Sequence, residues 1–145
     1  MGIVFYAQKN PPFFMIIIAL AIKLYDGGPV FYTQERLTRD GKPFKILKFR
    51  SMVVDAEKDG PQPAIDNDKR ITPVGKIIRS FRLDELPQLF NILKGEMSVV
   101  GPRPQLVRDM VFMTAEERKR HDVKPGLTGL AQISGRNAIA WERKL

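Results

Sequence analysis

Residues 79–95 constrain the fold of this chain most strongly. Apolar residues recur there at three- and four-residue steps, which is typical of one buried helix face: Leu83, Leu86, Leu89, Phe90 and Leu93. Pro87 is tolerated only near the start of a helix, where its missing N–H needs no partner. A cation followed by glycine at the end of the stretch is a stop signal. The pattern therefore predicts one helix that begins close to Asp84 and Glu85.

Asp84 and Glu85 form the most reactive feature of this stretch. Two adjacent carboxylates would lie at the positive end of the predicted helix, with Arg79 and Arg82 just upstream. That environment favours ionised carboxylates and attracts phosphate or a divalent cation. The simpler interpretation is an N-cap aspartate, a first-turn glutamate and two solvated arginines. These residues alone favour the simpler interpretation.

Composition narrows the classes of function. A chain of 145 residues suits a single domain with a modest core. It has no Cys, which excludes disulfides and thiolate metal sites, and its one histidine, His121, argues against a histidine-based zinc site. The net charge of +8 favours anionic partners such as nucleic acid, acidic lipid or phosphorylated substrates.

Residues 12–22 are apolar on every side, unlike an ordinary surface helix. A spanning helix needs about 20 apolar residues, so this shorter run better fits a core, interfacial or re-entrant segment. It lacks the basic start and cleavage site of a signal peptide. Lys23 could reach headgroups from its end. Because so small a chain has little core to hide this run, we expect membrane contact without spanning.

Residues 30–33 and 44–49 read as two strands from their β-branched and aromatic content. The Asp40-Gly41 pair between them is a hairpin turn signal. Alternation would place Lys48 and Arg50 on one face of the second strand. Basic and aromatic residues together suit a nucleic-acid surface or a phosphate pocket, whereas a solvated edge that resists aggregation is the structural alternative.

The other segments predict short elements. Residues 26–29 should break the first helix, 51–57 could start a helix, 58–69 read as a polar loop and 97–100 as a buried strand. Thr72 and Pro73 are an N-cap and a first helical residue that would deliver Arg79 to the Asp84 turn. Thr114 opens a capping box for a helix through residue 120.

Two further segments are candidates for binding. Prolines on both sides of Arg103 restrict its backbone and could hold the guanidinium toward an anion. Residues 125–137, which include Arg136, are glycine-rich without Walker or dinucleotide spacing. A tight structural loop and a substrate-binding loop explain this stretch equally well.

Four motifs together carry a resemblance to a known family. They are the residues 48–52 (KFRSM), 83–91 (LDELPQLFN), 101–104 (GPRP) and 125–129 (PGLTG). In this order the chain closely resembles the bacterial sugar transferases, the monotopic polyprenyl-phosphate phosphoglycosyl transferases. The resemblance covers residues 28–142, and four motifs in register are far more specific than any one.

The resemblance implies an activity and a set of partners. A sugar 1-phosphate would pass from a nucleotide-diphosphate sugar, with a UDP-sugar as the expected donor, to polyprenyl (undecaprenyl) phosphate with Mg²⁺ as cofactor. It also implies a re-entrant membrane helix and a place on the cytoplasmic face of the bacterial inner membrane. Membrane lipid is then a partner, nucleic acid is not, and a homo-oligomer is compatible with the sequence.

The resemblance also assigns roles to residues. Asp84 would be the nucleophile that forms a phosphosugar-aspartyl intermediate, and Glu85 would help to hold the metal or the acceptor phosphate. Both carboxylates are therefore candidate metal ligands, and Arg79 matches the arginine upstream of the family's acidic pair. The candidate substrate contacts are Lys48, Arg50, Arg103 and Arg136.

The chain departs from the family pattern at both ends. Only nine residues precede Asn10-Pro11-Pro12, where family members carry a longer apolar stretch before a Ser-Pro break, and the usual C-terminal extension is absent. The sequence is thus interpreted as a minimal or truncated member. The expected fold is α+β, a mostly helical single domain with a small hairpin. Residues 1–25 would form the membrane-associated helical segment, and 26–145 the catalytic domain on the cytoplasmic face.

A competing hypothesis needs no catalysis. A basic module that binds acidic membrane or nucleic acid through the hairpin would explain the net charge of +8. It would leave Asp84, Glu85 and the Arg103 turn without a role. A folded but inactive remnant of an enzyme is a third alternative.

Overall fold

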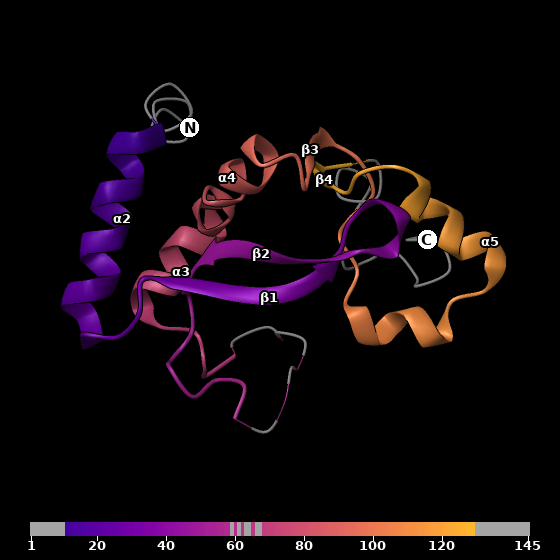
Figure 1. Cartoon of the computed structure of the whole chain (residues 1–145). Coiled ribbons are helices and arrows are strands. Elements are labelled where there is room, and N and C mark those ends of the chain that lie inside the picture. Colours follow the sequence, from indigo (N-terminus) through magenta and orange to yellow (C-terminus); the bar gives the residue numbers. More distant parts are fainter. Residues whose placement is uncertain (1–10, 59, 61, 63–64, 66–67, 130–145) are drawn as a thin grey trace. The chain divides into compact units, whose positions relative to one another are not determined.

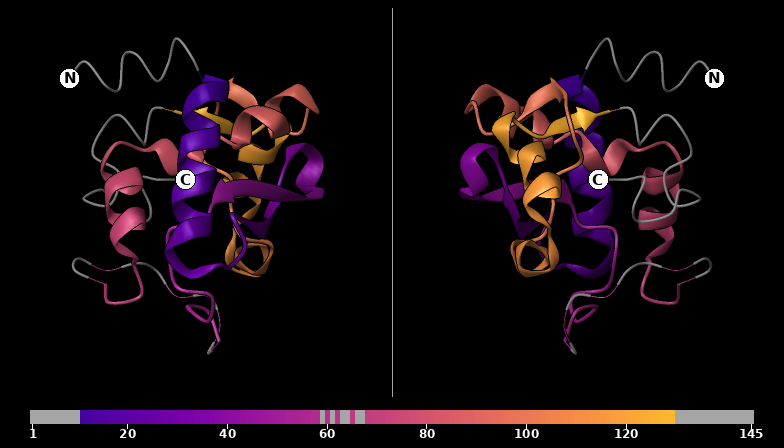
Figure 2. Two further views of the ribbon diagram at one scale, coloured as in Figure 1. Left: turned by 90° about the vertical axis from the view of Figure 1, so that its left-hand side faces the viewer. Right: turned by 90° about the vertical axis from the view of Figure 1, so that its right-hand side faces the viewer.

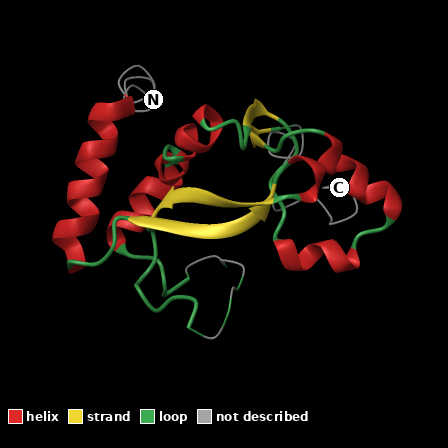
Figure 3. Ribbon diagram, viewed as in Figure 1, coloured by secondary structure: helices red, strands yellow, loops and turns green. Residues whose placement is uncertain are grey.

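The computed structural model describes residues 11–58, 60, 62, 65 and 68–129 (Figure 1). Helices and two small sheets make the fold α+β, as the sequence predicts (Figure 3). The helices and strands are α2 (Pro11–Asp26), β1 (Phe31–Leu37), β2 (Pro43–Phe49), α3 (Pro73–Ser80), α4 (Gln88–Leu93), β3 (Ser98–Val100), α5 (Ala115–Arg118) and β4 (Gly126–Thr128). Four short 3₁₀ turns join them: η1 (Arg39–Gly41), η2 (Leu83–Glu85), η3 (Val107–Phe112) and η4 (Lys119–Asp122).

The chain divides into two compact units. The first unit comprises Met1–Tyr32 and Lys48–Pro87, and the second comprises Thr33–Leu47 and Gln88–Leu145. The first unit therefore holds α2, α3, η2 and one end of the hairpin. The second holds the hairpin tip, α4 and the short elements that follow it.

The predicted hairpin is confirmed, because β1 and β2 pair as a two-stranded sheet (Figure 1). Its turn is the predicted Asp-Gly pair: Asp40 has φ of 61° and Gly41 has φ of 66°. Both are left-handed conformations, which glycine and aspartate tolerate better than most residues.

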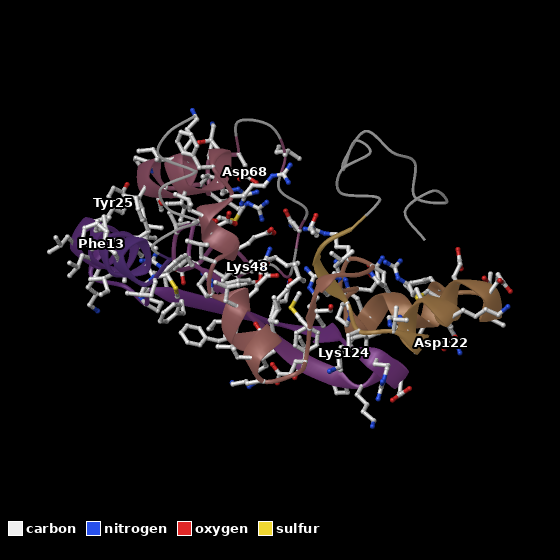
Figure 4. All side chains as sticks on the ribbon, turned by 90° about the horizontal axis from the view of Figure 1, so that it is seen from above. Phe13, Tyr25, Lys48, Asp68, Asp122 and Lys124 are labelled. Atoms are coloured by element: carbon white, nitrogen blue, oxygen red, sulfur yellow. The ribbon has the colours of Figure 1, made fainter. Side chains whose placement is uncertain are left out.

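Helix α2, the indigo helix in Figure 2, carries apolar side chains in two environments. Ile18 and Ile22 are buried, and they pack with Phe49 and Ile78 in the core of the first unit. The opposite side of the helix is exposed and apolar: Phe13, Ile16, Ile17, Leu20 and Leu24. Phe13 lies at one end of α2 and is labelled in Figure 4. The run is thus partly core, and its exposed face is what membrane contact would need.

Helix α2 ends where the sequence predicts. Asp26 is its last residue, and Gly27 follows with φ of 70°. Nζ of Lys23 donates to the Gly27 carbonyl oxygen at 2.7 Å, so this lysine caps the helix end. Among the helices of the described residues, none combines the length and the apolar character needed to cross a membrane.

Helix α3 forms from the predicted cap. The Thr72 hydroxyl accepts a hydrogen bond from the Gly75 N–H at 2.9 Å, and Pro73 is the first helical residue. Gly75 allows a very close approach, because a Cβ there would lie 1.8 Å from the Ser51 carbonyl oxygen. The start of α3 therefore rests directly on the backbone that follows β2.

The predicted single helix that begins close to Asp84 and Glu85 is wrong. The structure has the 3₁₀ turn η2, then Pro87, and then the separate helix α4. Leu93 is 82 % exposed, whereas the buried residues of α4 are Gln88 and Asn91. Physically, α4 lies against the backbone of β2, to which Asn91 offers hydrogen bonds that a leucine could not.

Of the other local predictions, some are confirmed and others are wrong. The predicted capping box at Thr114 is confirmed, although α5 ends at Arg118 and continues as η4. Residues 51–57 do not form the expected helix: Met52 pairs with Ile71 in an isolated bridge, and residues 54–57 form turns. The strand expected to be buried at 97–100 is β3, which pairs with β4, but Val100 is 68 % exposed.

Candidate active site

The acidic pair lies in η2, immediately after a residue with an unusual backbone. Arg82 adopts a left-handed conformation with φ of 57°, and Leu83–Glu85 then form a single 3₁₀ turn. Non-glycine residues rarely adopt this conformation, and where they do it often marks a functional position. The turn directs Asp84 and Glu85 into the first unit, where both side chains are partly buried.

Lys48 lies beside this pair. Its Nζ donates to Oε1 of Glu85 at 3.1 Å, and the exposed fractions of the two side chains are 21 % and 15 %. The side chains are drawn in Figure 4, where Lys48 is labelled. In this partly dry setting an ion pair is stronger than at the surface, because water screens it less.

Burial dominates the electrostatics of Asp84. Loss of water raises the pKa of its carboxyl, and the neighbouring Glu85 charge also raises it, while Lys48 and then Arg79 lower it. The net direction is upward. An ionised Asp84 is thus less stabilised than a carboxylate in water, which makes it a better nucleophile.

Arg79 reaches this site from the last turn of α3, as the sequence predicts. Its charge lowers the pKa of Asp84, and its Nη1 donates to the Ser51 hydroxyl at 3.5 Å. Ser51 lies two residues after Phe49, the last residue of β2. Lys48, Ser51, Arg79, Asp84 and Glu85 therefore converge within one unit from three separate segments.

Arg50 was predicted beside Lys48 as a substrate contact, but the structure gives it different partners. Its Nη1 and Nη2 donate to the two carboxylate oxygens of Asp26 at 2.7 and 2.5 Å, and its Nε donates to the Pro29 carbonyl oxygen at 2.6 Å. The side chain is buried. Lys48 and Arg50 thus face different carboxylates.

The remaining candidate residues belong to the second unit or lie outside the described residues. The side chain of Arg103 is exposed, and its backbone carbonyl accepts a hydrogen bond from Nη2 of Arg120 at 3.0 Å. Its turn is fixed, because a Cβ on Gly101 would lie 2.8 Å from the Gly126 nitrogen. Arg136 lies outside the described residues.

The candidate metal ligands predicted from the sequence are the carboxylates of Asp84 and Glu85. Within the described parts of the chain, no group of three or more His, Cys, Asp and Glu side chains could hold a metal. Mg²⁺ commonly binds through one or two carboxylates together with substrate phosphates. The chemistry of Asp84 and Glu85 therefore fits a magnesium ion that is shared with a bound diphosphate.

Sequence reasoning missed several residues that shape this site. Asp26 was interpreted only as a helix breaker, Ser51 only as part of a motif and of a possible helix start, and Gly75 was not singled out. A glycine one turn into a short helix is a weak signal for close backbone approach. Nothing local pairs Asp26 with Arg50, because they are separated by 24 positions.

Comparison with known proteins matches this chain to a family and to several relatives. The family model described as "Bacterial sugar transferase" matches residues 4–145. An uncharacterised sugar transferase of Bacillus subtilis, EpsL, is 47 % identical over 131 residues, which are 90 % of this chain and 64 % of that protein. The chain is also 51 % identical over 124 residues, 83 % of its length, to a Klebsiella pneumoniae protein named UDP-glucose:undecaprenyl-phosphate glucose-1-phosphate transferase, of which it covers 27 %.

A third relative is named for a different sugar. The UDP-N-acetylgalactosamine-undecaprenyl-phosphate N-acetylgalactosaminephosphotransferase of Aeromonas hydrophila is 46 % identical over 125 residues, 82 % of this chain and 29 % of that protein. The chain thus spans less than two thirds of the length of each of these relatives.

Proposed function

The chain belongs to the bacterial sugar transferase family, and we propose that it transfers a sugar 1-phosphate from a nucleotide-diphosphate sugar to polyprenyl phosphate. The names of two relatives support this reaction class, since both combine a UDP-sugar with undecaprenyl phosphate. The observation that carries the proposal is the partly buried cluster in which Lys48 pairs with Glu85 and the charges of Lys48 and Arg79 act on Asp84.

Asp84 is the nucleophile in this proposal. A carboxylate oxygen of Asp84 attacks the phosphorus that carries the sugar, and the bond from that phosphorus to the nucleoside monophosphate breaks. The nucleotide leaves with the electron pair, and a phosphosugar-aspartyl intermediate remains. A phosphate oxygen of the polyprenyl acceptor then attacks the same phosphorus and restores the Asp84 carboxylate.

The surrounding charges make this attack feasible. An anionic nucleophile must approach an anionic diphosphate, so cations have to offset the repulsion. Lys48 and Arg79 both favour the ionised form of Asp84. Glu85 is held by Lys48 at 3.1 Å, which fixes the second carboxylate while the first reacts.

Magnesium fits this arrangement as a shared ion. Asp84 and Glu85 would hold it together with the donor diphosphate, and the ion would neutralise charge that develops on the phosphate oxygens. With Glu85→Gln, we expect a higher Mg²⁺ requirement, and added Mg²⁺ should restore part of the rate.

Membrane contact is the second part of the proposal. The exposed apolar face of α2 would lie among lipid, on the cytoplasmic side of the inner membrane, close to the proposed lipid acceptor. Its residues include Ile16, which is 61 % exposed, and Leu20, which is 56 % exposed. A net charge of +8 suits a surface of anionic lipids.

The test uses the full chain in detergent with Mg²⁺ and a panel of UDP-sugars, but without acceptor. The correct donor should release at most one nucleoside monophosphate per protein and add the mass of one sugar phosphate to the Asp84 peptide. Asp84→Asn keeps the size of the side chain and should lose both signals, whereas the matched control Asp122→Asn, at an exposed position, should keep them.

Two outcomes would contradict the proposal. One is normal turnover by Asp84→Asn, and the other is an adduct that maps to a different peptide. Salt-sensitive binding to any polyanion, with no nucleotide release from any donor, would instead support the basic-module alternative.

A further inference from the structure

Arg50 is buried at the centre of a partly buried hydrogen-bond network. All three guanidinium nitrogens donate: Nη1 and Nη2 to Asp26, Nε to the Pro29 carbonyl, and Nη1 also to the Met52 carbonyl at 3.4 Å. Only 7 % of the side chain is exposed. A donor phosphate could reach this guanidinium only by displacing a carboxylate that already binds it in the fork geometry that arginine prefers.

Asp26 connects this network to helix α2. It is the last residue of the helix, and its Oδ1 also accepts from the Gly28 N–H at 3.0 Å. The chain then passes directly over the guanidinium, because a Cβ on Gly28 would lie 2.9 Å from Nη2 of Arg50. The ion pair holds the pKa of the Asp26 carboxyl down to about 2, so this carboxylate is charged at neutral pH.

Ser51 connects the same network to helix α3. The Ser51 carbonyl accepts from the Thr72 N–H at 3.0 Å, at the residue that caps α3. Gly75 of α3 approaches this carbonyl so closely that no side chain fits between them. Arg79, from the same helix, donates to the Ser51 hydroxyl.

These contacts form one continuous path within the first unit. It leads from the end of α2 through Asp26 and Arg50 to the Ser51 backbone, and from there through α3 to Arg79. Arg79 in turn acts on the charge of Asp84. A shift of Arg50 would thus move the segment on which α3 rests.

We propose that Arg50 is a positioning residue: its pairing with Asp26 fixes the end of the apolar helix α2 to the segment that carries α3, and so sets the placement of Arg79 relative to Asp84. This inference rests on the proposed function, because Asp84 and Arg79 act there in catalysis. It differs from the sequence-based expectation that Arg50 binds the donor.

A double-mutant cycle tests the proposal. Arg50→Gln, Asp26→Asn and the combined variant are assayed with saturating and limiting donor. Each single change should lower kcat by about ten- to a hundredfold through misplacement of Arg79, with donor KM nearly unchanged. The combined variant should be no slower than the slower single one, because both changes remove one interaction.

Two further variants sharpen the test. Arg50→Lys can still pair with Asp26, so it should recover part of kcat and keeps the test valid if Arg50→Gln fails to fold. Arg39 and Asp40 form an exposed ion pair at the hairpin tip, with exposed fractions of 57 % and 56 %. The matched changes Arg39→Gln and Asp40→Asn should therefore leave kcat within about twofold of the parent chain.

Amide hydrogen exchange separates this proposal from the proposed function. In Asp26→Asn the amides of α3 (Pro73–Ser80) should exchange faster than in the parent chain, whether or not the protein turns over any donor. Unchanged exchange in α3 overturns the proposal. The proposal is also overturned if Arg50→Gln raises donor KM by the same factor in the parent chain and in the Asp26→Asn background. A parent chain that releases no nucleotide, by contrast, would overturn the proposed function alone.

Discussion

Nζ of Lys48 lies 3.1 Å from Oε1 of Glu85, and this lysine is also the strongest charge that favours ionisation of Asp84. One ammonium group thus serves two adjacent carboxylates. Burial opposes the charge on Asp84, so its ionised form depends on Lys48 more than a solvated aspartate would. Removal of Lys48 should therefore alter the titration of Asp84 as well as the reaction rate.

Lys48→Met should move the acid limb of the pH–rate profile to higher pH. Asp84 must be ionised to attack, so activity falls as the pH drops through its pKa. Burial already raises this pKa, and loss of the lysine removes the largest effect that lowers it. The measurement is kcat/KM against pH, with Lys45→Met, an exposed lysine of β2, as control. An unshifted acid limb would mean that Asp84 and Lys48 are not coupled.

Asp84→Asn should stabilise the protein at neutral pH while it abolishes activity. A carboxyl whose pKa is higher in the folded state is penalised once it ionises, so the free energy of unfolding falls as the pH rises through the unfolded pKa of 3.8 and then through the raised folded value. The amide avoids this penalty. Denaturant titrations of both proteins should show a gain at pH 7 that disappears below pH 3.8. If the higher free energy of unfolding persists in acid, the effect of the substitution comes from packing and not from the charge.

The parts of the fold that sequence predicts well depend on neighbours along the chain. Thr72 caps α3, Asp40 and Gly41 make the hairpin turn, and Thr114 opens a capping box with Glu117. Each involves partners within three positions, so a local pattern contains the whole interaction.

The parts that sequence predicts poorly depend on distant partners. The periodic leucines suggested one amphipathic helix, but α4 buries Asn91 against a strand edge 44 positions away. Arg50 was grouped with Lys48 by strand alternation, yet its partner is Asp26 at the end of another helix. Periodicity reports that a face is buried in something apolar, and it carries no information on polar partners from elsewhere in the chain.

Asn91→Ala should destabilise the second unit. The Asn91 Oδ1 accepts from the Leu47 N–H at 3.0 Å, and its Nδ2 donates to the Lys45 carbonyl at 2.9 Å and to Oε2 of Glu96 at 2.7 Å. Alanine leaves these groups unpaired, at a cost of about 1–3 kcal/mol for each buried one. Denaturant unfolding measures the loss. Gln62→Ala, at an exposed position, is the control, and an equal effect of the two changes would show that the Asn91 bonds contribute nothing.

Arg103→Lys tests whether the rigid turn between two prolines presents a fork to the donor. Lysine keeps the charge but replaces two parallel N–H groups by a point charge, so a loss of about 1–3 kcal/mol in kcat/KM is expected. Arg39→Lys, at the exposed hairpin tip, is the matched control. Parent-like kinetics for Arg103→Lys would leave Arg103 a structural or solvated residue.

The exposed face of α2 should govern membrane binding. Leu20 is 56 % exposed on the side of the helix opposite the buried Ile18, so Leu20→Glu should leave the core intact. It removes one large apolar side chain from the lipid and adds a charge of the wrong sign for anionic headgroups. The transfer free energy lost with the leucine side chain alone is about 2 kcal/mol, which weakens partitioning onto the membrane by more than about tenfold. Co-sedimentation with vesicles that contain anionic lipid measures this change, and Val123→Glu, which replaces an apolar residue that is 54 % exposed in the second unit, is the control. If Leu20→Glu sediments with vesicles as well as the parent chain does, α2 does not lie in the membrane and its apolar face must bind something else.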